Sequence, residues 1–299
     1  MENRKLNDEE DPIGEALDIL PPVKQEKEEK KELVIEEDDT SVSDFVSARQ
    51  NIHDMIDASK ENGAEIVKFQ TWSVSRLKPG PWDEAGRTDI YKKAELSKSD
   101  HQELISHSQK SGVEFLSSAF SIQDAELLFD CGLTSVKVAS FESRNPTLLA
   151  FCDSHFDKVY LSTGTSSVDE ISKHLSYLPT TKVVLLHCVS SYPLEHCNAN
   201  LPRINLLREL NNEVGYSDHT FGIDGAKISL EYDPCVIEKH FTIDQSLPGR
   251  DNKFAILPED LKELSDYIQM RDEMNINHGG GYLKCEEEAR DIMTGRFSG

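Results

Sequence analysis

The sequence VVLLHC at residues 183–188 is a short run of apolar and β-branched residues, and similar runs follow in EVGYSD (213–218) and VIEKHFT (236–242). Strands that are covered on both faces of a parallel sheet have this nearly continuous apolar character. Runs of the same kind occur upstream in ELVIEE (32–37), IVKFQ (66–70), VEFLSSA (113–119), SVKVAS (135–140) and VYLST (159–163). The chain is therefore predicted to contain eight strands.

Amphipathic stretches separate these strands and predict helices, at residues 44–61, 99–111, 122–131, 167–176, 201–211, 222–231 and 258–274. Regular alternation of strand and helix predicts the α/β class, and eight such units within residues 32–275 predict a (β/α)8 TIM barrel. A doubly wound open sheet is the alternative. That fold more often has a glycine-rich phosphate loop after its first strand, and no such loop follows Ile35.

Acidic residues are concentrated at the start of the chain. Of the 299 residues, 55 are acidic and 32 basic, which gives a net charge of −23, and residues 1–40 alone carry 15 acidic and 6 basic side chains. Mixed-charge, low-complexity sequence cannot bury enough apolar surface to offset the entropy of ordering. We therefore expect residues 1–31 to be disordered, with an acidic docking tail as the alternative, and residues 276–299 to form a C-terminal extension or linker.

The composition also excludes several classes of partner and location. A strongly acidic chain is repelled by nucleic acid and by anionic lipid, so neither is expected as a partner. No run of 18 apolar residues is present, and the first residues lack the apolar stretch of a signal peptide. The six cysteines form no CxxC pair, which is typical of reduced thiols in a cytoplasmic protein.

Polar and ionisable residues recur where the predicted strands end, which is the face on which barrel enzymes carry their chemistry. Lys68 and Lys137 lie inside otherwise apolar strands, and an unpaired buried ammonium is costly, so each must meet an anion or reach solvent. The hydroxyls nearby belong to Ser118, Ser140 and Ser162. Together they predict a pocket for a phosphate or carboxylate group, whereas lysines that point outward are the alternative.

Two histidines follow or end the last two predicted strands, His219 in GYSDHT and His240 in EKHFT. Adjacent strands lie about 5 Å apart, so both imidazoles are expected to face one point. Two imidazoles with open coordination positions suit a divalent metal that acts as a Lewis acid, with Asp218 or Glu238 as a candidate orienting group. Hydrogen-bonded structural histidines are the alternative, and His187 is expected to be one.

Eight longer motifs occur in order along the chain: GAEIVKFQTW (63–72), FLSSAFS (115–121), KVASFE (137–142), LSTGTSS (161–167), VVLLHCVSSYP (183–193), GYSDHTFGID (215–224), VIEKHFTID (236–244) and LPGRDNKFAI (247–256). Together they resemble the N-acetylneuraminate (sialic acid) synthase family over roughly residues 50–260. The resemblance implies a (β/α)8 barrel that condenses phosphoenolpyruvate with an N-acylhexosamine such as N-acetylmannosamine. The implied products are a nonulosonic (sialic-type) acid and phosphate.

The resemblance also implies roles for individual residues. It makes His219 and His240 the ligands of a divalent metal, most often manganese, with magnesium or cobalt as alternatives. It places phosphoenolpyruvate among Lys68, Ser118, Lys137, Ser140, Ser162, Ser190 and Ser217, and the sugar along Gln70, Glu142, Tyr192 and Asp251. Glu142 is the first candidate for proton transfer and Glu238 the second, and a homodimer is expected.

The chain departs from the family pattern in two places. Members usually carry Glu-Ile-Gly-x-Asn-His-x-Gly at the first strand, where this chain has EEDDTSV (36–42). Many members continue into a C-terminal antifreeze-like domain, which is expected to be absent because the sequence ends at Arg296–Gly299. A catalytically impaired paralogue that acts as a binding or regulatory subunit is therefore the alternative to an active synthase. A third possibility is another barrel lyase or aldolase, for which Lys137 would be the candidate Schiff-base lysine.

Overall fold

The computed structural model describes residues 32–37, 45–80, 87–247 and 251–298. The predicted disordered head at 1–31 and residues 38–42 of the altered first-strand motif lie outside the described residues.

The strands lie where the apolar runs predict them and pair in parallel. They are β1 (Glu32–Glu37), β2 (Ile66–Thr71), β3 (Glu114–Ala119), β4 (Ser135–Val138), β5 (Lys158–Ser162), β6 (Lys182–His187), β7 (Val214–Asp218) and β8 (Val236–Phe241). Neighbours in the sequence are neighbours in the curled sheet, and β1 pairs with both β2 and β8. The predicted α/β class with a parallel sheet is confirmed.

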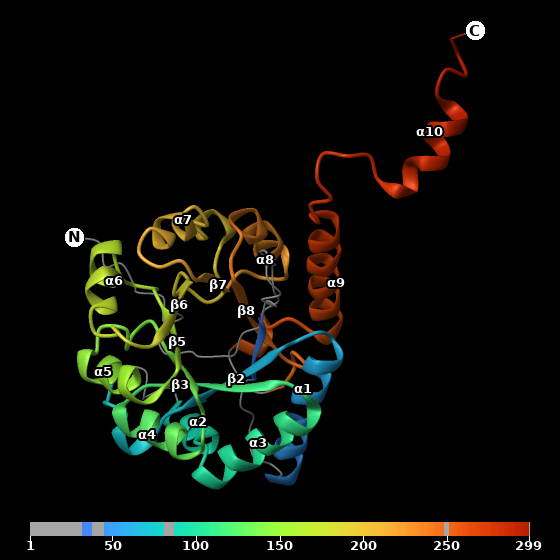
Figure 1. The fold of residues 1–299 in the computed structure, drawn as a ribbon. Helices are drawn as coiled ribbons and strands as arrows, with labels where there is room; N and C mark the ends of the chain where they lie inside the picture. Colours follow the sequence, from blue (N-terminus) through green and yellow to red (C-terminus); the bar gives the residue numbers. More distant parts are fainter. Residues whose placement is uncertain (1–31, 38–44, 81–86, 248–250, 299) are drawn as a thin grey trace, which may run out of the picture.

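Helices follow the strands, and all except α10 lie around the outside of the sheet (Figure 1). They are α1 (Phe45–Glu61), α2 (Arg87–Ala94), α3 (Lys98–Ser111), α4 (Ile122–Asp130), α5 (Pro146–His155), α6 (Val168–Leu175), α7 (Arg203–Arg208), α8 (Asp224–Ser229), α9 (Pro258–Met274) and α10 (Glu287–Met293). The amphipathic stretches predict all of these except α2, α5 and α10.

Local capping explains where several helices begin. α3 and α6 each start with a capping box, made by Ser97 with Asp100 and by Ser167 with Glu170. In each box the serine side chain accepts the backbone N–H of the acidic residue, and the acidic side chain accepts the backbone N–H of the serine. These helices therefore begin at defined residues, and α6 begins directly after the loop that leaves the carboxyl end of β5.

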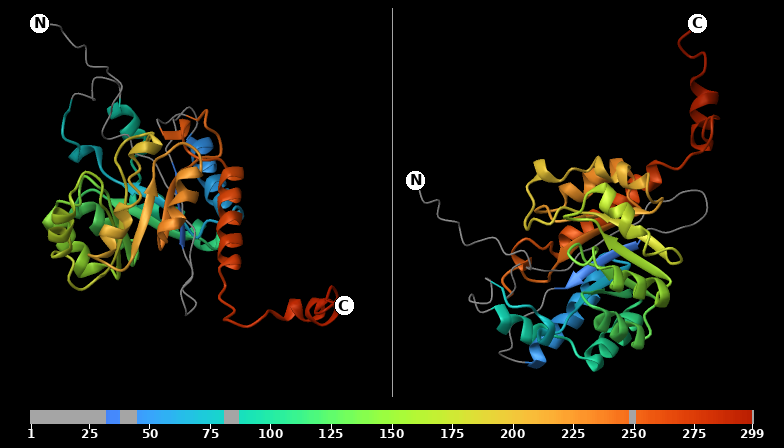
Figure 2. Two further views of the ribbon diagram at one scale, coloured as in Figure 1. Left: turned by 90° about the horizontal axis from the view of Figure 1, so that it is seen from above. Right: turned by 90° about the vertical axis from the view of Figure 1, so that its left-hand side faces the viewer.

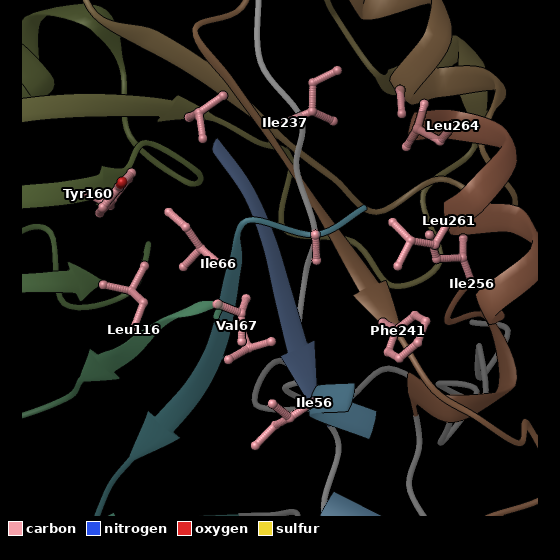
Figure 3. Close-up of a cluster of buried hydrophobic side chains, with 14 of the residues drawn as sticks. Ile56, Ile66, Val67, Leu116, Tyr160, Ile237, Phe241, Ile256, Leu261 and Leu264 are labelled. Carbon is pink, nitrogen blue, oxygen red and sulfur yellow. The ribbon is translucent and has the colours of Figure 1, made fainter. Parts of the chain in front are cut away.

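A buried apolar layer joins the strands to the surrounding helices (Figure 3). Phe241 of β8 packs in the same cluster as Leu261 and Leu264 of α9, while Ile56 of α1 and Val67 of β2 belong to it as well. All five side chains are fully buried. Removing a buried leucine side chain typically costs about 2–5 kcal/mol, so this layer is the rigid support on which the strand ends are held.

The last part of the chain leaves this layer. Residues 273–298, which include α10, are exposed, and α10 extends away from the strands and the helices around them (Figures 1 and 2). Within the described ranges, no helix has the length and apolar character required to cross a membrane.

Candidate functional site

A cavity opens at the carboxyl ends of the strands, and most of the predicted site residues line it. Including the part open to solvent, it contains about 440 Å³ of empty space. The lining residues are Lys68, Gln70, Ser118, Phe120, Lys137, Ala139, Ser140, Phe141, Ser162, Cys188, Tyr192, Ser217 and His219. They come from six strands or the loops directly after them, so the cavity depends on the curvature of the sheet.

Strand register aligns the polar groups on one wall. Gln70 of β2 is the register partner of Ser118 of β3, and Ser118 is the partner of Lys137 of β4. Side chains along a strand alternate between its two faces, so Lys68 and Gln70 share the cavity face. Val67 and Phe69 are buried on the opposite face, toward the helices. The alternation explains how a lysine can occur inside an apolar strand.

Both lysines are buried and share one carboxylate. Lys68 is 1% exposed and Lys137 6% exposed. Lys137 Nζ donates a hydrogen bond to Glu238 Oε1, and Lys68 Nζ lies 3.6 Å from Glu238 Oε2. Glu238, from β8, is itself 1% exposed. This group of three charged side chains carries one net positive charge at the base of the cavity, which suits it to an anionic ligand.

Hydroxyl groups and a glycine form the wall beside the lysines. A Cβ atom on Gly164 would lie 2.5 Å from Ser190 Oγ and 2.6 Å from Ser140 Oγ, so only glycine fits between these side chains. Ser190 Oγ is buried and has no hydrogen-bond partner among the residues that the structure describes. A buried hydroxyl of this kind is available to donate to a ligand oxygen.

Cys188 also reaches this wall. Its Sγ atom lies 3.2 Å from Ser140 Oγ. Burial raises the pKa of the Cys188 thiol, against the opposing effects of Ser140 and Lys137. Cys188 is therefore a neutral thiol at neutral pH and acts as a small, weakly polar part of the lining.

The two histidines lie close together, with ring centroids 5.3 Å apart. His219 Nδ1 is 2.9 Å from the backbone carbonyl oxygen of Val189. Because a carbonyl oxygen only accepts, Nδ1 must carry the proton, and Nε2 keeps its lone pair in the neutral ring. Tyr192 packs on His219 at a centroid distance of 4.4 Å, and Phe254 packs on His240 at 4.8 Å.

The histidine pair fits the donor set of a divalent metal with open coordination positions. A metal-binding histidine commonly donates its second N–H to a backbone carbonyl, as His219 does to Val189. Among the described residues no group of three or more histidine, cysteine, aspartate or glutamate side chains is arranged to hold a metal. A site built on His219 and His240 would leave coordination positions that oxygen ligands can fill.

Two further predicted residues, Glu142 and Asp251, are not among those that line the cavity. Glu142, in the turn after β4, is half-buried and accepts a hydrogen bond from Asn145 Nδ2 at 3.1 Å. Asp251 is 2% exposed and begins a short 3-10 helix (Asp251–Lys253). Outside the site, His187 Nε2 donates to the carbonyl oxygen of Ala199 at 2.8 Å, as expected of a structural histidine.

Several residues of the site were not singled out in the sequence. Cys188 and Gly164 follow β6 and β5, so a rule that inspects the first residues after each strand could have found both. Phe120 and Phe141 line the cavity, and Phe254 packs on His240. Phe120 directly follows β3 and Phe141 lies soon after β4, so the same rule reaches both positions, but nothing in the sequence distinguishes these aromatic residues from core residues.

Comparison with known proteins identifies relatives of the chain. It is 33% identical over 235 residues to N,N'-diacetyllegionaminic acid synthase of Legionella pneumophila, covering 72% of this chain and 66% of that protein. It is 32% identical over 232 residues to the synthase of the same name from Campylobacter jejuni, covering 72% and 70%. The chain thus spans about two thirds of the length of these relatives.

A solved structure and a family match agree with these relatives. The crystal structure of N-acetylneuraminic acid (sialic acid) synthetase from Leptospira borgpetersenii serovar Hardjo-bovis, in complex with citrate, superposes with a TM-score of 0.73 at 30% identity. The alignment covers 83% of this chain and 87% of that one. Residues 55–278 match the NeuB family. The chain therefore belongs to the NeuB family, the family of sialic and related nonulosonic acid synthases.

Proposed function

We propose that this protein condenses phosphoenolpyruvate with an N-acylhexosamine, such as N-acetylmannosamine, to form a nonulosonic acid and phosphate. The observation that carries the proposal is the cavity in which two buried lysines and a row of serine hydroxyls face His219. Such a site can hold a phosphate and a carboxylate close to a group that activates an aldehyde. The names of the relatives, which are legionaminic and sialic acid synthases, support the same reaction class.

The anionic substrate would lie against the lysines. Lys68 and Lys137 supply charge, and the hydroxyls of Ser118, Ser140, Ser162, Ser190 and Ser217 supply directional hydrogen bonds to phosphate or carboxylate oxygens. Charged donors that are already held in place stabilise negative charge without further reorganisation, which favours departure of the phosphate group.

The sugar would lie toward the outer part of the cavity. Gln70 and Tyr192 line it from β2 and from the loop after β6. Glu142, which follows the cavity-lining Phe141, and Asp251 are further proposed sugar contacts, and Glu142 is the proposed group for holding or moving a proton at a sugar hydroxyl or at the aldehyde oxygen. Holding both substrates in one cavity orients the methylene carbon toward the aldehyde carbon.

We assign His219 and His240 as ligands of a divalent cation, with manganese the first candidate. When bound, such an ion makes the aldehyde carbon more electrophilic. The support from this chain is the tautomer of His219, which the Val189 carbonyl sets so that Nε2 carries no proton, as a metal-binding nitrogen requires; Ser217 Oγ lies 3.4 Å from Nε2.

We also propose three further features of the protein. Residues 32–275 are proposed to form a complete (β/α)8 barrel, which the pairing of β1 with both β2 and β8 supports. A cytoplasmic location is supported by six cysteines without disulfide bonds. A homodimer is proposed from the family resemblance alone.

The reaction is tested by measuring phosphate release from phosphoenolpyruvate, with manganese and a panel of N-acylhexosamines. We expect release to require both the sugar and the metal. His219→Ala and His240→Ala should each lose manganese binding in an electron paramagnetic resonance titration and lose turnover, while thermal unfolding stays cooperative. Absence of phosphate release with every sugar, from wild-type protein that binds manganese, would refute the proposed reaction.

A further inference from the structure

A second ion pair is buried behind the histidines, on the opposite face of the strands. Lys239 Nζ donates to Asp218 Oδ2 at 2.9 Å and also to the backbone carbonyl oxygen of Thr220. Asp218 is 0% exposed and Lys239 1% exposed. The two residues are register partners on β7 and β8, so the ion pair crosses directly between neighbouring strands.

The pair lies outside the cavity. Along β8, Lys239 alternates with Glu238 and His240, and successive side chains of a strand point to opposite faces. Asp218 alternates in the same way with Ser217 and His219. Neither Asp218 nor Lys239 lines the cavity, and a direct role in contacting substrate is therefore not expected of them.

Asp218 also fixes the backbone on both sides of His219. Its Oδ1 atom accepts the backbone N–H of Thr220 at 2.9 Å and the hydroxyl of Tyr216 at 3.0 Å. Its Oδ2 atom accepts a hydrogen bond from the Thr220 hydroxyl at 3.1 Å. The residues before and after His219 are thus tied to each other by one carboxylate, which constrains the direction of the His219 side chain.

Helix α8 packs closely on this network. A Cβ atom on Gly225 would lie 2.4 Å from Thr220 Oγ1 and 3.0 Å from both carboxylate oxygens of Asp218. The network is therefore enclosed by protein and shielded from water. A buried ion pair contributes little net stability compared with apolar residues of the same volume, because both charges must be desolvated. Its presence here calls for a role other than stability.

We propose that Asp218 and Lys239 are positioning residues that set the relative placement of the His219 and His240 imidazoles. Asp218 and Lys239 immediately precede the two histidines, and the ion pair that joins them fixes the register of β7 against β8 at that point. The 5.3 Å separation of the rings follows from that register. The part of this inference that concerns metal binding rests on the proposed function.

The test compares Lys239→Met and Asp218→Asn with Lys227→Met. Asn keeps an oxygen for the Thr220 N–H but removes the charge opposite Lys239. Lys227, on α8, pairs with Glu263 of α9 at 2.6 Å near the surface, so its replacement by Met is a matched control.

Two measurements are made on each folded variant. The first is the nitrogen NMR spectrum of the histidine side chains in metal-free protein, in which we expect shifted His219 and His240 signals in both test variants and unchanged signals in the control. The second is manganese affinity by electron paramagnetic resonance, which should fall about 10- to 100-fold in the test variants, as is typical when a group supporting a metal ligand is removed.

The outcomes separate this inference from the proposed function. Wild-type signals and wild-type manganese affinity in both test variants would overturn the positioning role and leave the proposed function intact. Shifted histidine signals in the variants would support the positioning role even where the wild-type protein neither binds manganese nor releases phosphate, a result that would refute the proposed function alone.

Discussion

Replacing Glu238 by Gln tests whether one carboxylate neutralises two buried lysines. The substitution keeps the size of the side chain and removes the negative charge between Lys68 and Lys137. At the 3.6 Å separation of Lys68 Nζ and Glu238 Oε2, the Coulomb energy is about 5 kcal/mol with an effective dielectric constant of 20. Desolvation opposes much of this energy, but the substitution removes the carboxylate that both buried ammonium groups contact.

Removal of one partner from a buried ion pair typically costs about 3–5 kcal/mol. For a domain of this size class, each kcal/mol corresponds to roughly 2–4 °C in the melting temperature. We therefore expect Glu238→Gln to melt about 10 °C below wild type. Phosphoenolpyruvate should raise the melting temperature of the variant by more than it raises that of wild type, because the ligand supplies the missing negative charge.

The assay is differential scanning calorimetry with and without phosphoenolpyruvate. Glu263→Gln is the matched control, because Glu263 is 65% exposed and pairs with Lys227 at the surface. Exposed pairs contribute about 0–1 kcal/mol. A Glu238→Gln protein with the melting temperature of the control and the ligand response of wild type would refute the reasoning that the lysines depend on this carboxylate.

Two more predictions concern the serine wall and a buried histidine. Gly164→Ala places a methyl group 2.5 Å from Ser190 Oγ and should raise the KM for phosphoenolpyruvate at least tenfold, which corresponds to about 1.4 kcal/mol. Gly280→Ala is the control, because no atom lies within 4 Å of the added methyl group. Equal KM values in the two variants would contradict the assignment of the serine wall to phosphoenolpyruvate binding. Burial lowers the pKa of His187 from 6.5 to about 4. As the pH falls, the unfolded chain is therefore protonated at this residue before the folded protein is, and the free energy of unfolding decreases between pH 6.5 and pH 4. We expect a decrease of about 3 kcal/mol, which urea unfolding across that pH range would measure. His187→Gln should make the decrease smaller. An unchanged pH dependence in the variant would assign the decrease to other groups.

The strands were predictable because each one is a largely apolar run, and β2 to β8 are mostly buried along their length. β4 ends at Val138, two residues before the predicted end, because Ala139 and Ser140 already turn to line the cavity. α5 was missed because its sequence, PTLLAFCDSH, has no clear amphipathic period, although Leu148, Leu149 and Cys152 are all buried. α10 was missed for the opposite reason: its residues are all exposed, so no apolar face marks it.

The site was predictable where one strand decides the direction of a side chain, and unpredictable where several strands meet. Period-two alternation places Lys68 and Gln70 on the same face of β2 from local sequence alone, whereas the sequence left open whether that face points inward. The contact of Lys137 with Glu238 joins residues 101 positions apart, and only closure of the sheet brings β4 opposite β8. The same holds for the fit of Gly164 between Ser140 and Ser190, which come from different strand ends.

The charge of the whole chain is a poor guide to the charge of the site. The net charge is −23, yet the base of the cavity holds two ammonium groups and one carboxylate, all buried. An ammonium group has three donors, so Lys137 can share its donors between Glu238 and a ligand. A bound anion then joins the carboxylate as an acceptor and does not displace it. Glu238 lowers the net positive charge that faces the anion, and we expect it to weaken the binding of a product phosphate by Lys68 and Lys137.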